Sequence, residues 1–147
     1  MRICLIGYGY WGKNLARVFG KDLVAICDNN QDNLDKAKEL YDVQYFSNKD
    51  ELYQSDLDYD TVAIATKADT HFELATTFLI ADKNIWLEKP ACIKTKDIEY
   101  LIKIRKDKKV FVDHTFVYHP AIQKIKSLDI GTPLYYDSHR ISLGLFQ

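Results

Sequence analysis

Residues 3–19 read ICLIGYGYWGKNLARVF, and this stretch decides the fold. An apolar strand over residues 3–6 runs directly into the pattern G-x-G-x-x-G at Gly7, Gly9 and Gly12. The apolar residues around and behind these glycines recur at the spacing of one helix face: Trp11, Leu15, Val18 and Phe19. A strand, a glycine loop and a helix in this order predict a dinucleotide-binding turn.

Each glycine has its own task in such a turn. The first permits the tight bend, the second lets backbone approach a pyrophosphate, and the third allows the helix to pack closely on the strand. The pyrophosphate would then lie on N–H groups at the positive end of the helix. The alternative interpretation is a tight strand–helix turn with no ligand.

An acidic residue follows the second apolar strand, which we predict over residues 23–27. Asp28 lies about 20 residues after Gly7, where a carboxylate accepts hydrogen bonds from the adenosine ribose. A carboxylate there repels a 2′-phosphate, and the neighbouring Asn29 and Asn30 supply no arginine for one. We therefore predict NAD rather than NADP, with a simple strand-end cap as the alternative role of Asp28.

Strand and helix patterns alternate along the rest of the chain. Further strands are predicted over residues 43–46, 61–65, 84–87 and 110–112. The residues that mark four expected helices are Leu34, Ala37 and Tyr41; His71, Leu74, Ala75, Phe78 and Leu79; Ile98, Leu101 and Ile102; and Ala121, Ile122, Ile125 and Leu128, which follow Pro120. Thr95 is the expected cap of the third of these helices. Ser47 is the expected cap of a further short helix, with Glu51 near the capping-box position. This alternation predicts an α/β fold with a doubly wound parallel sheet, the Rossmann arrangement.

The end of the chain follows a different pattern. Gly131-Thr132-Pro133 interrupts it, and residues 134–143 read as a long strand. We expect a Rossmann domain over residues 1–117, and a linking helix with the first strand of a missing or truncated α+β C-terminal domain over residues 118–147. A truncated chain and a split gene both remain open as explanations.

Composition excludes several classes of function. The 147 residues carry 20 basic and 21 acidic side chains, which gives no basic excess for nucleic acid. Three widely spaced cysteines give neither a disulfide framework nor a zinc site, and His114 and His119 are poorly spaced for a shared metal. We find no signal peptide and no stretch long enough to span a bilayer, so we expect no metal, no membrane partner and a cytoplasmic location.

The corner Glu88-Lys89-Pro90 follows the predicted strand over residues 84–87. Ligands of such sheets bind beyond the carboxyl ends of the strands, so Lys89 would stand near the nicotinamide. A lysine beside a carboxylate can exchange a proton with a sugar hydroxyl. Pro90 restricts Lys89 to extended geometry and is compatible with a cis bond. A surface turn is the alternative.

Together these motifs resemble the Gfo/Idh/MocA family, which includes glucose–fructose oxidoreductase and inositol dehydrogenase. The matching stretches are GYGYWGKN at 7–14, AICD at 25–28, IATKADTHFELA at 64–75 and WLEKPAC at 86–92. HTFVYHPAIQKIK at 114–126 and RISLGLFQ at 140–147 look most like the branch of nucleotide-sugar 3-dehydrogenases. The resemblance implies an NAD-dependent oxidoreductase acting on a hydroxyl of a sugar or nucleotide-sugar, and a homo-oligomer in the full-length form.

The resemblance also implies roles for single residues. Lys89 matches the catalytic lysine, and His114 falls where the family approaches its substrate. Apart from the resemblance, we expect Arg140 to contact the substrate through a sugar-nucleotide phosphate, with an exposed strand arginine as the alternative. The expected cofactor-binding residues are Gly7, Tyr8, Gly9, Tyr10, Trp11, Gly12, Asp28, Asn29, Thr66, Lys67, His71, Glu88 and Lys89.

Two departures from the family pattern matter. Lys67 stands where many relatives have proline, and the family's catalytic histidine belongs to the C-terminal domain. The alternatives are therefore an NAD(H)-binding module without turnover, and an NAD-sensing regulator, although no DNA-binding element is visible.

Overall fold

The structure is a computed structural model that describes residues 1–132, 135, 137 and 139. The chain divides into two compact units, Met1–His114 and Thr115–Gln147. The predicted boundary after residue 117 and the assignment of residues 118–147 to a second domain remain predictions. The strand predicted over residues 134–143 lies largely outside the described residues.

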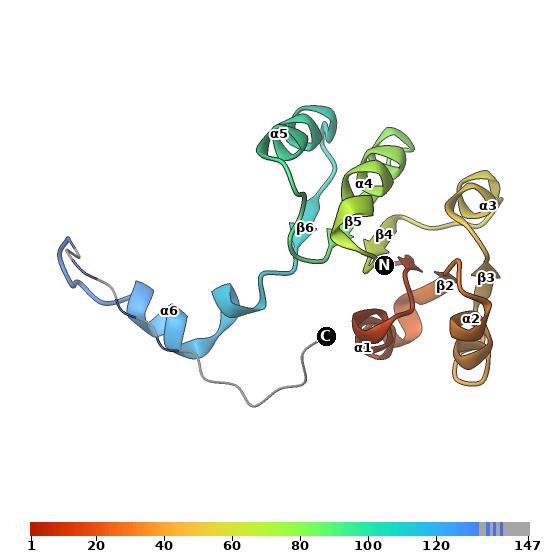
Figure 1. Cartoon of the computed structure of the whole chain (residues 1–147), viewed down its shortest axis with the longest axis horizontal. Coiled ribbons are helices and arrows are strands. Elements are labelled where there is room, and N and C mark those ends of the chain that lie inside the picture. The colour runs from red at the N-terminus through yellow and green to blue at the C-terminus, as the bar shows by residue number, and fades with distance from the viewer. Residues whose placement is uncertain (133–134, 136, 138, 140–147) are drawn as a thin grey trace. The chain divides into compact units, whose positions relative to one another are not determined.

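The first unit is a six-stranded parallel sheet (Figure 1). Its strands are β1 (Ile3–Ile6), β2 (Leu23–Cys27), β3 (Gln44–Phe46), β4 (Thr61–Ile64), β5 (Asn84–Leu87) and β6 (Val110–Val112). Their order across the sheet is β3-β2-β1-β4-β5-β6. This is the doubly wound Rossmann order, with the change of direction between β1 and β4, so the predicted fold class is confirmed.

Helices cover both faces of this sheet (Figure 1). The α-helices of the unit are α1 (Tyr10–Phe19), α2 (Gln31–Lys38), α3 (Lys49–Gln54), α4 (His71–Ile80) and α5 (Thr95–Ile104), with the 3-10 turns η1 (Gly20–Asp22) and η2 (Ala68–Thr70). Helices α1 and α2 share one hydrophobic cluster with the sheet, and α3, α4 and α5 share the other. Alternate residues of β1 supply the two clusters, as the period of a strand requires.

The second unit contains η3 (Thr115–Tyr118) and α6 (Pro120–Lys126). Pro120 occupies the first helical position, where its missing N–H costs nothing. The His119 side chain accepts a hydrogen bond from the Ala121 N–H at 3.2 Å and caps the helix. Leu128, expected on this helix, lies beyond its end at Lys126.

The structure corrects several predicted helix details. Trp11 and Val18 are 47% and 66% exposed, because α1 turns its small residues Gly12 and Ala16 toward the sheet together with Leu15 and Phe19. Ile98 and Ile102 on α5 are also exposed, and only Leu101 is buried.

The expected helix boundaries shift as well. Asn48 rather than Ser47 caps α3, since its side chain accepts the N–H groups of Asp50 and Glu51. Lys94 occupies the cap position of α5, so Thr95 is its first residue. Tyr41 lies beyond the end of α2.

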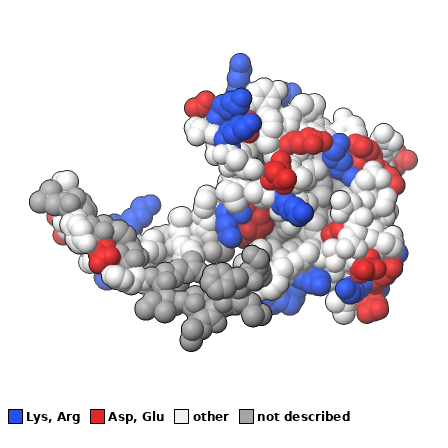
Figure 2. Space-filling view, viewed as in Figure 1, with Lys and Arg blue, Asp and Glu red and all other residues white. Residues whose placement is uncertain are grey.

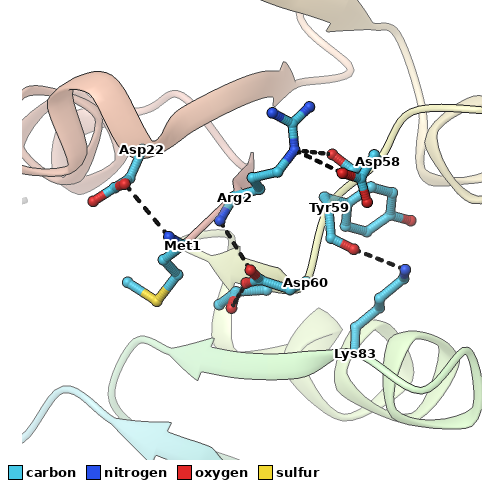
Figure 3. A network of polar contacts seen from close by, with 8 residues as sticks. Met1, Arg2, Asp22, Asp58, Tyr59, Asp60 and Lys83 are labelled. Carbon is cyan, nitrogen blue, oxygen red and sulfur yellow. Dashed lines mark hydrogen bonds and ion pairs between the residues drawn. The ribbon is translucent and has the colours of Figure 1, made fainter.

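A network of hydrogen bonds links the amino ends of the strands, here called the amino edge of the sheet (Figure 3). The Arg2 backbone N–H donates to Asp60 at 3.1 Å, and its guanidinium donates to the Asp58 carbonyl at 2.7 Å. The Lys83 ammonium donates to the Tyr59 carbonyl at 2.8 Å and lies 4.3 Å from the centre of the Tyr59 ring. These contacts tie the starts of β1, β4 and β5 together.

The surface is mixed in charge. Figure 2 shows acidic and basic side chains intermixed on the viewed face, in keeping with the balanced composition. No helix among the described residues has the length and apolar character needed to cross a membrane.

Candidate dinucleotide and substrate site

The glycine loop joins β1 to α1 with the geometry that its three glycines permit. Gly7 has φ +93°, and a Cβ there would lie 2.8 Å from the Ala65 carbonyl oxygen. A Cβ on Gly12 would overlap the carbonyl oxygen of Gly7. A Cβ on Gly9, in contrast, would meet no atom within 4 Å. Gly7 and Gly12 are thus required by the fold, while Gly9 leaves open space at the N-terminus of α1.

The open space beside Gly9 suits a phosphate group. Gly9 is the N-cap of α1, and no side chain caps the helix there. The first N–H groups of a helix have no partner inside it, and the helix dipole favours an anion at this end. The loop therefore fits the pyrophosphate of a dinucleotide.

The aromatic residues of the loop divide into two kinds. Tyr8 is 1% exposed, and its ring packs edge-on against Tyr41 at 6.2 Å between centroids. Burial raises the pKa of Tyr8 to about 12. Tyr10 and Trp11 are exposed and contact each other edge to face at 5.4 Å. Tyr8 therefore shapes the loop from inside, and Tyr10 and Trp11 are the aromatic rings that a ligand can reach.

Asp28 holds the glycine loop to the end of β2. Its Oδ2 accepts the Tyr8 N–H at 2.6 Å and the Asn33 side-chain amide at 3.1 Å, and its Oδ1 accepts the Asn30 N–H at 2.8 Å. A carboxylate has about four acceptor positions, so Oδ1 keeps one for a ribose hydroxyl. Asn29 is exposed beside it. The contact from Asn33 was not predicted, since no spacing rule marks that residue.

The loop after β4 packs against the glycine loop. The Thr66 and Thr70 hydroxyls are 2.7 Å apart, and Thr70 donates to the Lys67 carbonyl at 2.8 Å. Lys67 itself is exposed. A Cβ on Gly7 would lie 2.9 Å from the Thr66 side chain, which shows how closely the two loops approach.

His71 lies behind this loop rather than on its surface. The side chain is 1% exposed, and its ring nitrogens lie 2.9 Å from the Pro90 carbonyl oxygen and 3.1 Å from that of Thr66. A direct contact between this ring and a cofactor, expected from the sequence, does not fit that burial. His71 instead connects two loops that border the site.

The Glu88-Lys89-Pro90 corner follows β5 with a cis Lys89–Pro90 bond. Glu88 is 7% exposed, whereas Lys89 is exposed. Burial raises the pKa of the Glu88 carboxyl, and the neighbouring carboxylate of Asp113 raises it further. The Lys89 N–H donates to Glu88 Oε2 at 3.3 Å. The corner thus presents the lysine outward from a buried carboxyl group.

Asp113 reaches Glu88 because β5 and β6 are neighbours in the sheet. Leu87 pairs with Val112, and the Asp113 N–H donates to the Leu87 carbonyl at 2.9 Å. Asp113 was missed from the sequence because its importance depends on this pairing. The adjacent His114 is exposed, while Arg140 lies outside the described residues.

All these residues follow strands of a parallel sheet at the same edge. Gly7 follows β1, Asp28 follows β2, Thr66 comes shortly after β4, and Glu88 follows β5. Ligands of open α/β sheets bind at this carboxyl edge, near the change of strand order. No group of three potential metal-ligating side chains occurs within the described part of the chain.

Comparison with known proteins agrees with this geometry. Residues 1–116 match the model of an oxidoreductase family described by its NAD-binding Rossmann fold, the GFO_IDH_MocA family. The chain belongs to the Gfo/Idh/MocA oxidoreductase family. The resemblance inferred from the motifs is thereby confirmed, and the matched part is the NAD-binding domain of that family.

Individual members of the Gfo/Idh/MocA family match nearly the whole chain. UDP-N-acetylglucosamine 3-dehydrogenase of Acidithiobacillus ferrooxidans is 26% identical over 97% of the chain, which spans 46% of that protein. Myo-inositol 2-dehydrogenase of Thermotoga maritima is 31% identical over 99% of the chain, which spans 50% of that protein. The chain thus spans about half the length of these curated relatives.

A solved structure extends the comparison to the fold. The WlbA dehydrogenase of Bordetella pertussis, in complex with NADH and UDP-GlcNAcA, superposes with a TM-score of 0.78 at 25% identity. The match covers 86% of this chain and 40% of that one. This Gfo/Idh/MocA member carries NADH on the same fold.

Proposed function

We propose that this chain is the cofactor-binding half of an NAD-dependent dehydrogenase that oxidises a hydroxyl of a sugar or nucleotide-sugar. The observation that carries the proposal is the open space at Gly9, which lies at the N-terminus of α1 in a loop tied to Asp28. The relatives named for UDP-N-acetylglucosamine and myo-inositol support the substrate class.

Lys89 is the group proposed to handle the substrate proton. It stands exposed at the carboxyl edge, beside the buried carboxyl of Glu88. When bound, NAD supplies a nicotinamide that accepts a hydride from the substrate carbon. Lys89 would accept the hydroxyl proton on its amine, becoming an ammonium group, and would later pass that proton to solvent. His114 follows the neighbouring strand β6 and is the proposed substrate contact from this unit.

The first test is NADH binding measured by isothermal titration calorimetry. A Gly9→Val variant fills the open space beside Gly9, so we expect it to weaken NADH binding by about tenfold or more, which is about 1.4 kcal/mol. The control is Val18→Ala, at an exposed position of the same helix. Unchanged affinity in Gly9→Val, with the fold verified by circular dichroism, would contradict the cofactor site.

The second test concerns the choice between NAD and NADP. Asp28 keeps one acceptor for a ribose hydroxyl and places a negative charge where a 2′-phosphate would lie. We expect NADH to bind about tenfold or more tightly than NADPH in the same calorimetric titration. Equal affinities would remove the selective role assigned to Asp28.

A second candidate function is an NAD(H)-binding module without turnover. The chain spans about half of its curated relatives, which favours this alternative for the 147 residues taken alone. Incubation with NAD and UDP-sugars separates the two, with reduced nicotinamide followed by its absorbance. NADH binding without turnover would identify the module, and turnover lost in Lys89→Met would identify the dehydrogenase.

A further inference from the structure

A groove lies between helices α1 and α2, within the first unit. Its volume is about 450 Å³, and pockets that bind small molecules hold about 300–1,000 Å³. The side chains that line it come from the glycine loop and α1 on one side, and from α2 and the residues after it on the other. They include Tyr8, Lys13, Arg17, Lys36, Glu39 and Tyr41.

Positive charge is concentrated in this groove. Lys13, Arg17 and Lys36 line it and are exposed, and Glu39 is the carboxylate that lines it with them. Three cations against one anion leave an excess of two positive charges, whereas the chain as a whole has a net charge of −1. The groove therefore attracts anions although the whole chain does not.

The three cations have no anionic partner in the described part of the chain. None of the ion pairs there includes Lys13, Arg17 or Lys36. Lys38, which lies two residues after Lys36 on the same helix, is paired with Asp35 at 3.1 Å. The cations of the groove are thus free to bind a ligand.

Helix dipoles alone do not account for these cations. Arg17 and Lys36 lie in the last turns of α1 and α2, where the dipole favours a positive charge. Lys13, in contrast, is the fourth residue of α1 and lies near the opposite end of that helix. The charges share the groove rather than one helix terminus.

The charge and size of the groove favour a phosphate ester. A phosphate monoester carries about −1.5 to −2 charges at pH 7, which matches the excess of two positive charges. The Arg17 guanidinium can bind phosphate oxygens in pairs, and the lysines can act as point charges beside it. The half-buried Tyr41 offers apolar surface for the organic part of such a ligand.

We propose that the groove between α1 and α2 binds a phosphate monoester of a sugar or nucleoside, as a site separate from the proposed cofactor site. Tyr8 adjoins both, because its side chain lines the groove while its N–H donates to Asp28 at 2.6 Å. The proposal does not require that the chain binds NAD(H).

The test is isothermal titration calorimetry on the full chain with three probes: uridine monophosphate, glucose 6-phosphate and inorganic phosphate. At least one ester should bind about tenfold or more tightly than inorganic phosphate, and the tighter ester identifies the nucleoside or the sugar as the organic part. Added salt should weaken this binding, because the cations are exposed. Saturating NADH should leave it in place.

Charge variants locate the bound ester. Arg17→Gln and Lys36→Gln should each weaken its binding by about tenfold or more, since hydrogen bonds to a charged group are lost. Glu39→Gln should strengthen binding severalfold, because it removes a repulsive carboxylate. The matched control is Lys96→Gln, which makes the same charge change at an exposed position of α5 and should bind as wild type does.

Separate results contradict the two proposals. Esters that bind no more tightly than inorganic phosphate would overturn the groove site, and so would wild-type affinity in folded Arg17→Gln and Lys36→Gln. Displacement of the ester by NADH would assign it to the cofactor site and overturn the groove as well. If the chain binds no NADH, the proposed function fails, and the ester titrations still decide the groove.

Discussion

At the scale of single residues, buried polar groups position the exposed ones. Asp28 and Glu88 are 8% and 7% exposed, and each stands beside a backbone segment proposed to meet the ligand. Asp28 accepts from three protein donors, one of which, the Tyr8 N–H, belongs to the glycine loop. Glu88 has a raised pKa, because it is buried and faces Asp113. The site therefore depends on buried carboxyl groups that position neighbouring backbone, and Asp28 also keeps one acceptor position for the proposed ribose.

The raised pKa of Glu88 predicts a pH dependence of stability. A carboxyl whose pKa is raised by folding binds its proton more tightly in the folded state, so unfolding free energy falls as pH rises through that range. Asp113→Asn removes the like charge and keeps an acceptor. We expect this variant to match wild type below about pH 4, the ordinary glutamate range, and to exceed wild-type stability at neutral pH.

Urea unfolding at a series of pH values measures this difference. The control is Asp56→Asn, which changes an exposed carboxylate away from the site and should give no pH-dependent gain. An equal or lower stability of Asp113→Asn at neutral pH would show that repulsion between the two carboxyls is unimportant.

The residue scale also shows what the sequence could reveal about the site. Gly7, Asp28 and Lys89 come directly after or within two residues of predicted strands, so their places at the carboxyl edge could be predicted. The roles of Asn33, Asp113 and His71 depend on which loops become neighbours. His71 in particular binds two backbone carbonyls, and these leave no mark in the side-chain pattern.

At the scale of elements, helix α4 anchors one face of the sheet. Phe78 is fully buried in the cluster that α3, α4 and α5 share, whereas Ile80 on the same helix is 66% exposed. We expect Phe78→Ala to lower the unfolding free energy by about 3–5 kcal/mol. Ile80→Ala, the matched control, should change it by less than about 0.5 kcal/mol.

Chemical denaturation compares these two variants directly. Similar losses in both would mean that the Ile80 side of α4 is also buried. A small loss in Phe78→Ala alone would indicate that the core collapses to fill the space.

Strands were easier to predict than helix faces for a physical reason. Buried parallel strands are continuously apolar, so their ranges stand out in the sequence, and β1, β2, β5 and β6 match the prediction. On α1 the sheet-facing positions include Gly12 and Ala16, whose small size permits close packing. A search for large apolar residues therefore gave Trp11 and Val18 instead.

At the scale of the whole molecule, the amino edge of the sheet carries structural contacts and the carboxyl edge carries the proposed site. The amino edge is closed by the contacts of Arg2, Asp60 and Lys83 (Figure 3). The carboxyl edge carries the loops of the proposed site. All proposed cofactor-binding residues lie within the unit Met1–His114.

This division predicts that the first unit suffices for cofactor binding. A chain of residues 1–114 should bind NADH with an affinity within about threefold of the full chain, a difference below about 1 kcal/mol. Calorimetry on both chains, with circular dichroism to verify folding, measures it. A loss of tenfold or more in a folded 1–114 chain would mean that residues 115–147 contribute to the cofactor site.

The two tryptophans lie in different surroundings, and the difference has an optical consequence. Trp86 lies against Phe19 and Phe111, at 5.5 and 4.4 Å between ring centroids, while Trp11 is half exposed in the first turn of α1. Indole emission overlaps the absorption of reduced nicotinamide, so Trp11 is an energy-transfer donor beside the proposed ligand. The chain therefore carries its own fluorescent reporter, and Trp11→Phe would remove it while leaving the partly buried indole of Trp86 in place.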